Sequence, residues 1–312
     1  MNSLGLSKEA RLAVGRRARG QNTLRLLRNA LRTPRGATGA TLVAIVVLIA
    51  ALGPLLASGS PTGSPGLPFE NPTEGAIFGY DELGRDVLTR VLHGGWTLLL
   101  LAAAATIVGV GAGTIVGVAA AYFKGLSDGV LMRTADIVLA FPQLVLALLL
   151  VSVAGPSVTL IVFAVALAHT PQVARVVRAA ALDVCERDYV KAIELFRISS
   201  WRVIFGEVVP GVVSVIMVEL GLRLTYSILV IAALSFLGFG LQPPDPNWGL
   251  MVNENRIGLS QNPWALVVPA GLIAVLTIGM NTFTDAVARV LLGVDEIAAT
   301  RAGMTTPTPE PK

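Results

Sequence analysis

Six long apolar runs alternate with polar segments along the chain. A transmembrane helix needs about 17 to 25 predominantly apolar residues to cross the hydrocarbon core of a bilayer. The apolar runs cover residues 37–57, 96–123, 134–154, 158–174, 208–236 and 264–283. The pattern therefore predicts an all-α membrane protein with six transmembrane helices.

The composition supports this class of protein. Of the 312 residues, 54% are hydrophobic and 14% are charged, whereas a soluble domain carries about 25% charged residues. The chain contains one cysteine, Cys185, and two histidines, His93 and His169. These residues are too few for a disulfide framework or a His/Cys metal cluster.

The polar segments divide the chain into parts. Residues 1–36 form a basic arm that holds nine Lys and Arg residues ahead of the first apolar run at 37–57. A cleaved signal peptide is the alternative for this run, but the lengths of the arm and of the run favour an uncleaved anchor. A loop rich in Gly, Pro and Ser follows at 58–95. The remaining five helices form a core at 96–285, and residues 286–312 are a tail.

The distribution of basic residues predicts the orientation of the chain. If the amino terminus is cytoplasmic, the inner segments hold 20 Lys and Arg residues, and the outer segments hold three. Cytoplasmic loops of membrane proteins carry such an excess of positive charge. We therefore expect both termini and the segment 188–210 in the cytoplasm, and the loops 58–95 and 238–263 outside.

The polar segment 188–210 is longer than a connection between two spans requires. Tyr189, Ile193 and Phe196 follow an i, i+4, i+7 spacing, which places them on one face of a helix. Residues 198–200 interrupt this pattern, and a second helical run leads into the next span. A segment of this kind docks on lipid headgroups or on a partner protein. Because its charges are mixed rather than basic, we predict that the three apolar side chains anchor a partner protein.

Gly109, Gly113 and Gly117 recur every four residues within the second apolar run. Small residues at this spacing let two membrane helices approach each other closely. A phosphate-binding glycine loop is the alternative, but the run is apolar and lacks an adjacent lysine. We therefore predict close helix packing here, and a kink or a helix boundary at Pro142.

Two charged residues lie within the fifth apolar run. Glu219 and Arg223 are four residues apart, so they can pair on one face of a helix. Charges within a membrane span are costly and often mark a functional site. The pair either neutralises itself inside the bundle or lines a translocation path, and the sequence leaves both interpretations open.

The sequence carries no catalytic or nucleotide-binding motif. It lacks a His-Glu-x-x-His motif, a nucleophile elbow and a Walker A motif. We therefore expect no enzymatic activity and no bound cofactor, and any energy from ATP must enter through another polypeptide. An ion-coupled secondary transporter and a membrane anchor without transport activity are the alternatives from other classes.

The polar segment before the fifth span resembles the coupling motif of bacterial ATP-binding-cassette (ABC) importer permeases. That motif is Glu-Ala-Ala, three residues, Gly, and a Pro thirteen positions after the Gly. Pro210 follows Arg197 by thirteen positions, and Ala192 and Pro210 match the motif in type. Lys191, Ile193 and Arg197 stand in place of its Glu, its second Ala and its Gly. The coupling residues that the resemblance implies are Tyr189, Lys191, Ala192, Ile193, Phe196, Arg197 and Pro210.

Three further stretches resemble the C-type permease subunit of the peptide/nickel importer family. They are GYDELGRDVLTRVLHGG at 79–95, DGVLMRTADIVLAFP at 128–142 and LSFLGFGLQPPDPNWG at 234–249. The resemblance covers about residues 20–295. It implies a type I ABC importer permease fold in the bacterial plasma (inner) membrane, with di- or oligopeptides as cargo; nickel chelates or another small solute stay open.

The resemblance also implies partners. A homologous second permease would form a heterodimer with this chain in the lipid bilayer, and two cytoplasmic ATPases, which hold ATP and Mg²⁺, would dock on the coupling segment. An extracytoplasmic binding protein would deliver the substrate, and no nucleic acid is expected. The candidate contacts for the binding protein are Asp81, Arg85, Asp86, Pro243, Pro244 and Trp248.

Overall fold

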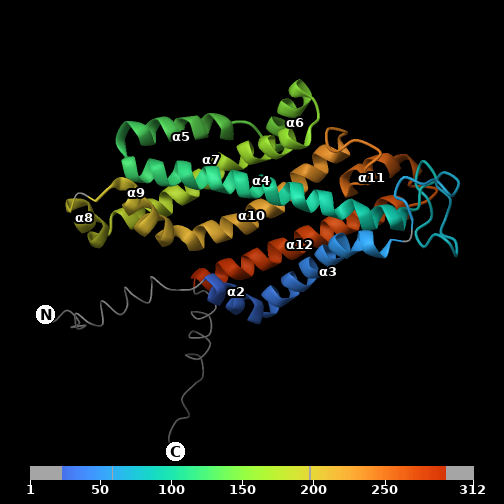
Figure 1. The fold of residues 1–312 in the computed structure, drawn as a ribbon, viewed down its shortest axis with the longest axis horizontal. Coiled ribbons are helices and arrows are strands. Elements are labelled where there is room, and N and C mark those ends of the chain that lie inside the picture. Colours follow the sequence, from blue (N-terminus) through green and yellow to red (C-terminus); the bar gives the residue numbers. More distant parts are fainter. Residues whose placement is uncertain (1–22, 58, 197, 293–312) are drawn as a thin grey trace, which may run out of the picture.

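The computed structural model describes residues 23–57, 59–196 and 198–292. Within these residues the regular elements are helical, and they form an elongated bundle (Figure 1). The elements are α2 (Thr23–Arg32), α3 (Pro34–Leu56), α4 (Val87–Phe123), α5 (Gly125–Leu139), α6 (Gln143–Ala154), α7 (Val158–Cys185), α8 (Asp188–Leu195), α9 (Ser200–Val203), a π-helical turn η1 (Ile204–Val208), α10 (Val209–Phe236), α11 (Trp248–Asn255), a 3-10 turn η2 (Arg256–Gly258) and α12 (Trp264–Leu292).

The described chain contains five helices that are long and apolar enough to cross a membrane, and the pair α5 and α6 makes six if it is counted as one bent span. The two helices of this pair meet at 83°. Pro142 lies at the break, where it is the N-cap of α6. Proline lacks the amide hydrogen that would continue the helical hydrogen bonds. The predictions of an all-α membrane fold and of a boundary at Pro142 are confirmed.

The expected boundary between the first loop and the second span is wrong. α4 begins at Val87, nine residues before residue 96. Asp86 caps it, because its Oδ2 accepts a hydrogen bond of 2.7 Å from the Thr89 amide. The apolar pattern missed this start because the first turns of α4 include polar residues. The last turns of α7 were missed for the same reason, since this helix continues to Cys185 instead of ending at residue 174.

The basic arm contains helical structure that the sequence pattern did not predict. α2 lies within it, and α3 begins at Pro34, three residues before the expected first span. Thr33 caps α3, and its Oγ1 accepts a hydrogen bond of 3.0 Å from the Gly36 amide. α12 extends to Leu292, beyond the expected end of the core at residue 285. Residues 1–22 and 293–312 lie outside the described chain.

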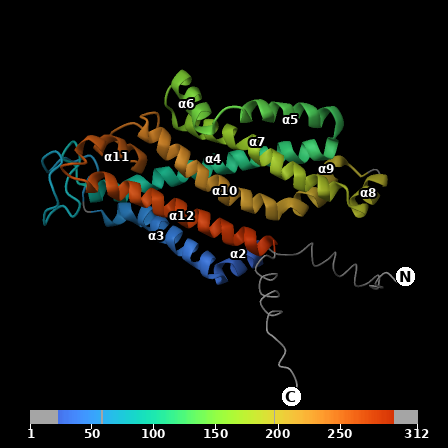
Figure 2. The ribbon, with the colours of Figure 1, turned by 180° about the vertical axis from the view of Figure 1, so that it is seen from behind.

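The long helices form three groups that are seen in both opposite views. α3 and α12 lie side by side along one edge of the bundle, and α5 and α6 lie along the opposite edge (Figures 1 and 2). α4, α7 and α10 run between these two groups. The segment with α8 is at one end of the bundle, and α11 and the first loop are at the other; we call them the α8 end and the α11 end.

The glycines at 109, 113 and 117 of α4 pack against α7, which confirms the predicted close helix packing. A Cβ atom at Gly113 would lie 2.6 Å from Val173 Cβ, and one at Gly117 would lie 2.5 Å from the carbonyl oxygen of Ala174. A Cβ at Gly109 would likewise lie 3.0 Å from the backbone of α7. Only hydrogen atoms fit at these three positions, so the two helices pack at backbone distance.

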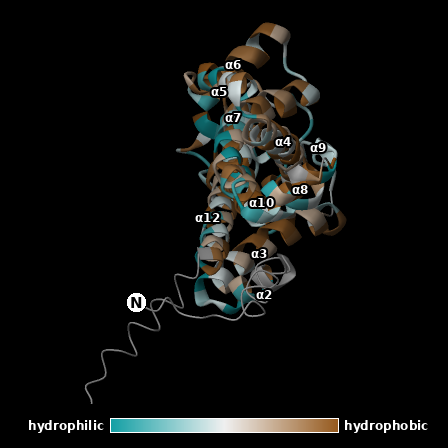
Figure 3. Cartoon of the chain, turned by 90° about the vertical axis from the view of Figure 1, so that its left-hand side faces the viewer, coloured by the Kyte–Doolittle hydropathy of each residue, from teal (hydrophilic) through white to brown (hydrophobic). Residues whose placement is uncertain are grey.

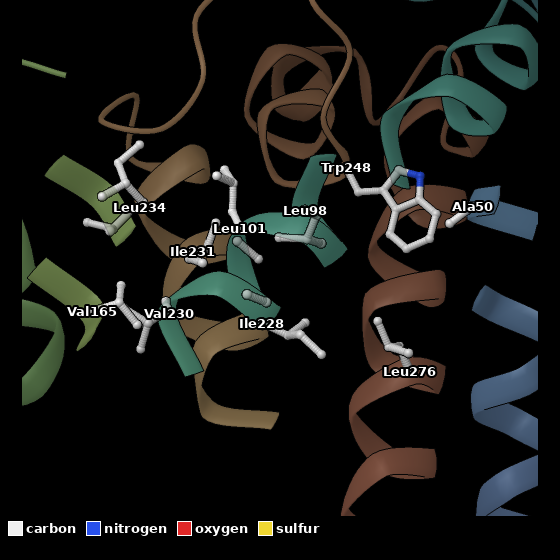
Figure 4. Packing of buried hydrophobic residues seen from close by; sticks show 14 of the residues in the cluster. Ala50, Leu98, Leu101, Val165, Ile228, Val230, Ile231, Leu234, Trp248 and Leu276 are labelled. Atoms are coloured by element: carbon white, nitrogen blue, oxygen red, sulfur yellow. The ribbon is translucent and has the colours of Figure 1, made fainter. Parts of the chain in front are cut away.

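Trp248 is the largest fully buried side chain among the described residues and belongs to the main core cluster. Its ring lies beside Ala50 of α3 (Figure 4), and a Cβ at Gly95 of α4 would lie 2.3 Å from the ring. The indole Nε1 donates a hydrogen bond of 2.8 Å to the carbonyl oxygen of Val91. One side chain from the segment after α10 thus fixes α11 against the ends of the spans.

Large apolar side chains also cover much of the outside of the bundle. Ile107 and Ile115 of α4 and Ile278 of α12 are all more than half exposed. Figure 3 shows apolar segments on the outer helices as well as between them. A soluble protein rarely exposes apolar patches on this scale, whereas lipid tails or other apolar helices can cover them in a membrane.

Candidate functional site

The polar segment after α7 folds as two short helices, as its sequence pattern predicts. α8 comprises Asp188–Leu195, and α9 begins at Ser200 after a break. The π-helical turn η1 then joins α9 directly to α10. Pro210 is exposed within the first turn of α10. The segment is therefore continuous with the span that carries Glu219 and Arg223.

The inner face of α8 packs on the protein's own core. Val190 is fully buried in a cluster with Val203 and Val208, and Tyr189 and Ile193 pack against that cluster while partly buried. The expectation that Tyr189, Ile193 and Phe196 anchor a partner protein stays a prediction. Two of these three side chains attach α8 to the ends of the neighbouring helices.

Phe196 differs from the other two residues, because 80% of its side chain is exposed. Lys191 and Ala192 are exposed as well. Arg197, which takes the position of the motif's glycine, lies outside the described residues. Among the described side chains, the exposed surface of this segment thus includes Lys191 and Ala192 of α8 and Phe196, which directly follows the helix.

The sequence pattern did not predict a second exposed aromatic group in this segment. Trp201 and Phe205 stack with their ring centroids 5.8 Å apart and their planes at 16°. Both rings are about two-thirds exposed, at 66% and 64%. Their i, i+4 spacing was the available signal. An exposed aromatic pair is the kind of group that anchors a protein interface or lies at a membrane surface.

A buried ionic cluster lies at the α11 end of the bundle. Asp81 Oδ2 accepts from Arg85 Nε at 2.7 Å and from Arg90 Nη1 at 2.6 Å. Glu254 Oε2 accepts from Arg90 Nη1 at 2.6 Å and from Arg85 Nη2 at 3.2 Å. Two carboxylates therefore balance two guanidinium groups, and the cluster joins the first loop, α4 and α11.

This cluster corrects part of the expected binding-protein surface. Asp81 and Arg85 are buried in it, and Trp248 is buried in the core, so none of the three side chains is available for contact. Asp86 is half-buried and caps α4. Pro243 and Pro244 are exposed, and their contact with a binding protein stays a prediction. Sequence alone gives the chemical character of these residues, but not which of their side chains are buried.

Next to the cluster, Glu82 is about one-quarter exposed, and its carboxyl group has a raised pKa. The main cause is burial, which disfavours the charged form, followed by repulsion from Glu254. The Glu82 amide donates a hydrogen bond of 3.1 Å to Asn255 Oδ1. The residue thus connects the first loop to the end of α11.

Glu219 and Arg223 lie in contact on α10. Arg223 Nε donates to Glu219 Oε2 at 2.9 Å. Arg223 Nη1 also donates to Gln172 Oε1 of α7, and the Tyr226 ring centroid is 5.5 Å from Arg223 Cζ. Both charged residues are buried. The geometry forms the expected ion pair, and its role in a translocation path stays a prediction.

A second polar network crosses the middle of the bundle. His169 Nε2 lies 2.9 Å from Ser227 Oγ, which lies 2.9 Å from Thr106 Oγ1. Thr106 donates to the carbonyl oxygen of Ala102 at 2.7 Å. Because the Thr106 hydroxyl hydrogen is used in this bond, Thr106 Oγ1 accepts a hydrogen bond from the Ser227 hydroxyl. Ser227 Oγ in turn accepts a hydrogen bond from His169 Nε2. Nδ1 of His169 is then left to accept from Gln143 Nε2 at 3.1 Å.

This network links α6, α7, α10 and α4 beside the break at Pro142. Sequence reasoning did not assign any of its side chains, because small polar residues in apolar runs give no spacing signal. Within the described residues, no group of three His, Cys, Asp or Glu side chains could hold a metal ion. The polar groups inside the bundle therefore form helix-to-helix contacts and a charged pair.

The helical architecture, the apolar surface and the intramembrane polar groups define a multi-pass membrane protein. Comparison with known protein families gives the class. Residues 109–292 match the family described as "binding-protein-dependent transport system inner membrane component". The chain belongs to this family of inner-membrane permeases, so the expected resemblance to importer permeases is confirmed.

Relatives match over most of the chain. The glutathione transport system permease protein GsiD of Pectobacterium atrosepticum is 34% identical over 216 residues, which are 69% of this chain and 72% of the relative. A putative peptide transport system permease protein of Brucella suis is 34% identical over 258 residues, 81% of this chain and 86% of the relative. GsiD of Escherichia coli O6:K15:H31 is 38% identical over 208 residues, 67% and 69% of the two chains.

Proposed function

We propose that this chain is the transmembrane permease subunit of an ATP-driven importer that moves di- or oligopeptides into the cell. Its family membership supports the permease role, and the names of its relatives support a peptide cargo. The observation that carries the proposal is the attachment of α8. This short helix packs on the end of α7 and on α9, and α9 continues through η1 into α10, so a force on α8 reaches the spans.

The proposal includes the other subunits of such an importer, which the family membership supports. ATP and Mg²⁺ would bind to two cytoplasmic ATPases, and an extracytoplasmic binding protein would deliver the peptide. A homologous second permease would complete the path as a heterodimer, since one chain leaves much of its apolar surface uncovered. ATP binding would close the ATPase pair and shift the permeases between two arrangements.

In this mechanism α8 transmits the movement. Val190, Tyr189 and Ile193 hold the inner face of α8 on the bundle, and Phe196 projects outward. An exposed aromatic ring that enters a pocket of a partner typically contributes at least about 2 kcal/mol, or roughly thirtyfold in affinity. The residues that attach α8 and the residue that contacts the ATPase are therefore different.

The test uses the complete complex in proteoliposomes, loaded with ATP on the ATPase side. We expect uptake of a labelled dipeptide that requires ATP and the binding protein. Phe196→Ala should weaken ATPase co-purification or uncouple hydrolysis from uptake. Phe163→Ala, which removes an exposed ring from α7 instead, is the matched control and should keep coupling.

Three results would contradict the proposal. Uptake that follows an ion gradient without ATP would indicate a secondary transporter. ATP-driven uptake of a nickel chelate but not of peptides would change the cargo. Wild-type coupling in Phe196→Ala would show that α8 does not transmit movement through this ring.

A further inference from the structure

Arg223 lies near the middle of α10. It is separated from both ends of α10 (Val209–Phe236) by about 20 Å, at about 1.5 Å of rise per residue. Lipid phosphates at either surface are therefore out of its reach. A cation at this depth faces a bundle interior or a water-filled route.

The guanidinium group is oriented but not fully used. Glu219 accepts from Nε at 2.9 Å, and Gln172 of α7 accepts from Nη1. Among the described residues, Nη2 has no hydrogen-bond partner. Glu219 thus holds the Arg223 guanidinium at Nε. The opposite edge, formed by Nη1 and Nη2, contacts only the neutral amide of Gln172 among the described residues.

Tyr226 covers this group from outside the bundle. Its ring centroid is 5.5 Å from Arg223 Cζ, and 47% of its side chain is exposed. A ring with so few neighbours can change its rotamer at little cost, in contrast to a buried ring. Arg223 is itself buried, and Tyr226 is one of the groups that cover it.

The exposed face of α10 around Tyr226 is also unsuited to lipid. A phenolic hydroxyl, an amide and a charged pair lie together on α7 and α10 at mid-span. Of these groups Tyr226 is exposed, and contact of its hydroxyl with hydrocarbon costs about 1–3 kcal/mol when it has no hydrogen-bond partner. Their common position favours a face that lines an aqueous route between this chain and its partner.

From this geometry we infer that Arg223 and Gln172 form a transient site for the C-terminal carboxylate of a peptide in transit. The inference rests on the proposed peptide transport. The carboxylate accepts two parallel hydrogen bonds, one from Nη1 and one from Nη2 of Arg223, in a bidentate arrangement. Gln172 turns its amide and donates to the same carboxylate, and Glu219 stays on Nε and keeps the guanidinium in place.

An Arg–carboxylate contact of this kind discriminates between charged and neutral termini. A peptide amide presents one acceptor oxygen and no charge, so it loses one of the two parallel hydrogen bonds. Hydrogen bonds to charged groups are about twice as strong as neutral ones. We expect the site to favour the free carboxylate by about tenfold in uptake rate.

Gln172→Glu gives the sharpest test, because it keeps the shape of the side chain and adds a charge. Its own carboxylate would occupy the Nη1 edge permanently and exclude that of the peptide. The measurement is the uptake rate of one dipeptide with a free C-terminus divided by that of its C-terminal amide. Comparison of this ratio between variant and wild type cancels the preference of the binding protein, which is the same in both.

We expect the ratio to fall about tenfold in Gln172→Glu. The double variant Glu219→Gln with Arg223→Gln should show the same fall without leaving an unpaired charge, and it serves if Gln172→Glu does not yield a folded complex. Gln261→Glu makes the same chemical change on an exposed loop residue and should keep the wild-type ratio.

An unchanged ratio in both the Gln172→Glu and the double variant, with peptide uptake intact, would overturn the carboxylate site and leave the proposed function in place. Absence of ATP-dependent uptake of either peptide by the wild-type complex would instead overturn the proposed function. The two failures are thus distinguishable.

Discussion

The closeness of α4 and α7 gives a quantitative prediction for Gly117. A Cβ added at this residue would lie 2.5 Å from the carbonyl oxygen of Ala174 and 3.0 Å from the amide nitrogen of Arg178. Both atoms belong to the backbone of α7, so no side-chain rotation can relieve the clash. Gly117→Ala should therefore force the two helices apart, at a cost of about 1–3 kcal/mol.

Gly111 provides a matched control on the same helix. A Cβ at Gly111 meets nothing within 4 Å, so Gly111→Ala changes only the helix propensity. That change favours alanine by about 0.5–1 kcal/mol at either position. Because this gain is common to both variants, their difference in stability isolates the packing cost, which we expect to be about 1–3 kcal/mol.

The assay is equilibrium unfolding of the purified chain in detergent micelles, followed by circular dichroism. Gly111→Ala should be as stable as the wild type or more stable, and Gly117→Ala should be less stable than both. If the two variants unfold at the same denaturant concentration, α4 and α7 are not in backbone contact at Gly117, and the packing argument fails.

The α11 end and the orientation of the chain give three more predictions. Asp81→Asn removes one of two carboxylates from a buried cluster with two arginines and should cost about 3–5 kcal/mol, whereas Asp245→Asn, on the exposed loop, should change stability little; thermal unfolding measures both. Glu82 has a raised pKa, so the folded chain holds its proton more tightly than the unfolded chain, and stability should fall as pH rises from 4.5 through the raised pKa. Glu82→Gln should flatten that dependence, and an unchanged pH profile would contradict the burial argument. Lys191→Cys in a Cys185→Ser background should resist an impermeant thiol reagent in intact cells, and strong labelling would reverse the expected orientation.

The apolar runs determined the class of the protein, because a run of about 20 apolar residues is stable as a membrane helix whatever its neighbours are. The glycine spacing at 109, 113 and 117 determined a close contact, although only the fold shows that α7 is the partner. Pro142 determined the break in the third span, because proline lacks the backbone amide hydrogen that the helix needs at that residue. The coupling segment and the three further stretches were sufficient to identify the family.

Only the tertiary structure decided which polar side chains face outward. Asp81 and Arg85 are charged residues of a predicted loop, yet they are buried because Arg90 and Glu254 neutralise them there, and Glu254 is distant in sequence. Tyr189 and Phe196 share a helical spacing, yet one packs on the core and the other is exposed. Burial and charge pairing depend on residues that the chain brings together from far apart, so no local pattern in the sequence contains them.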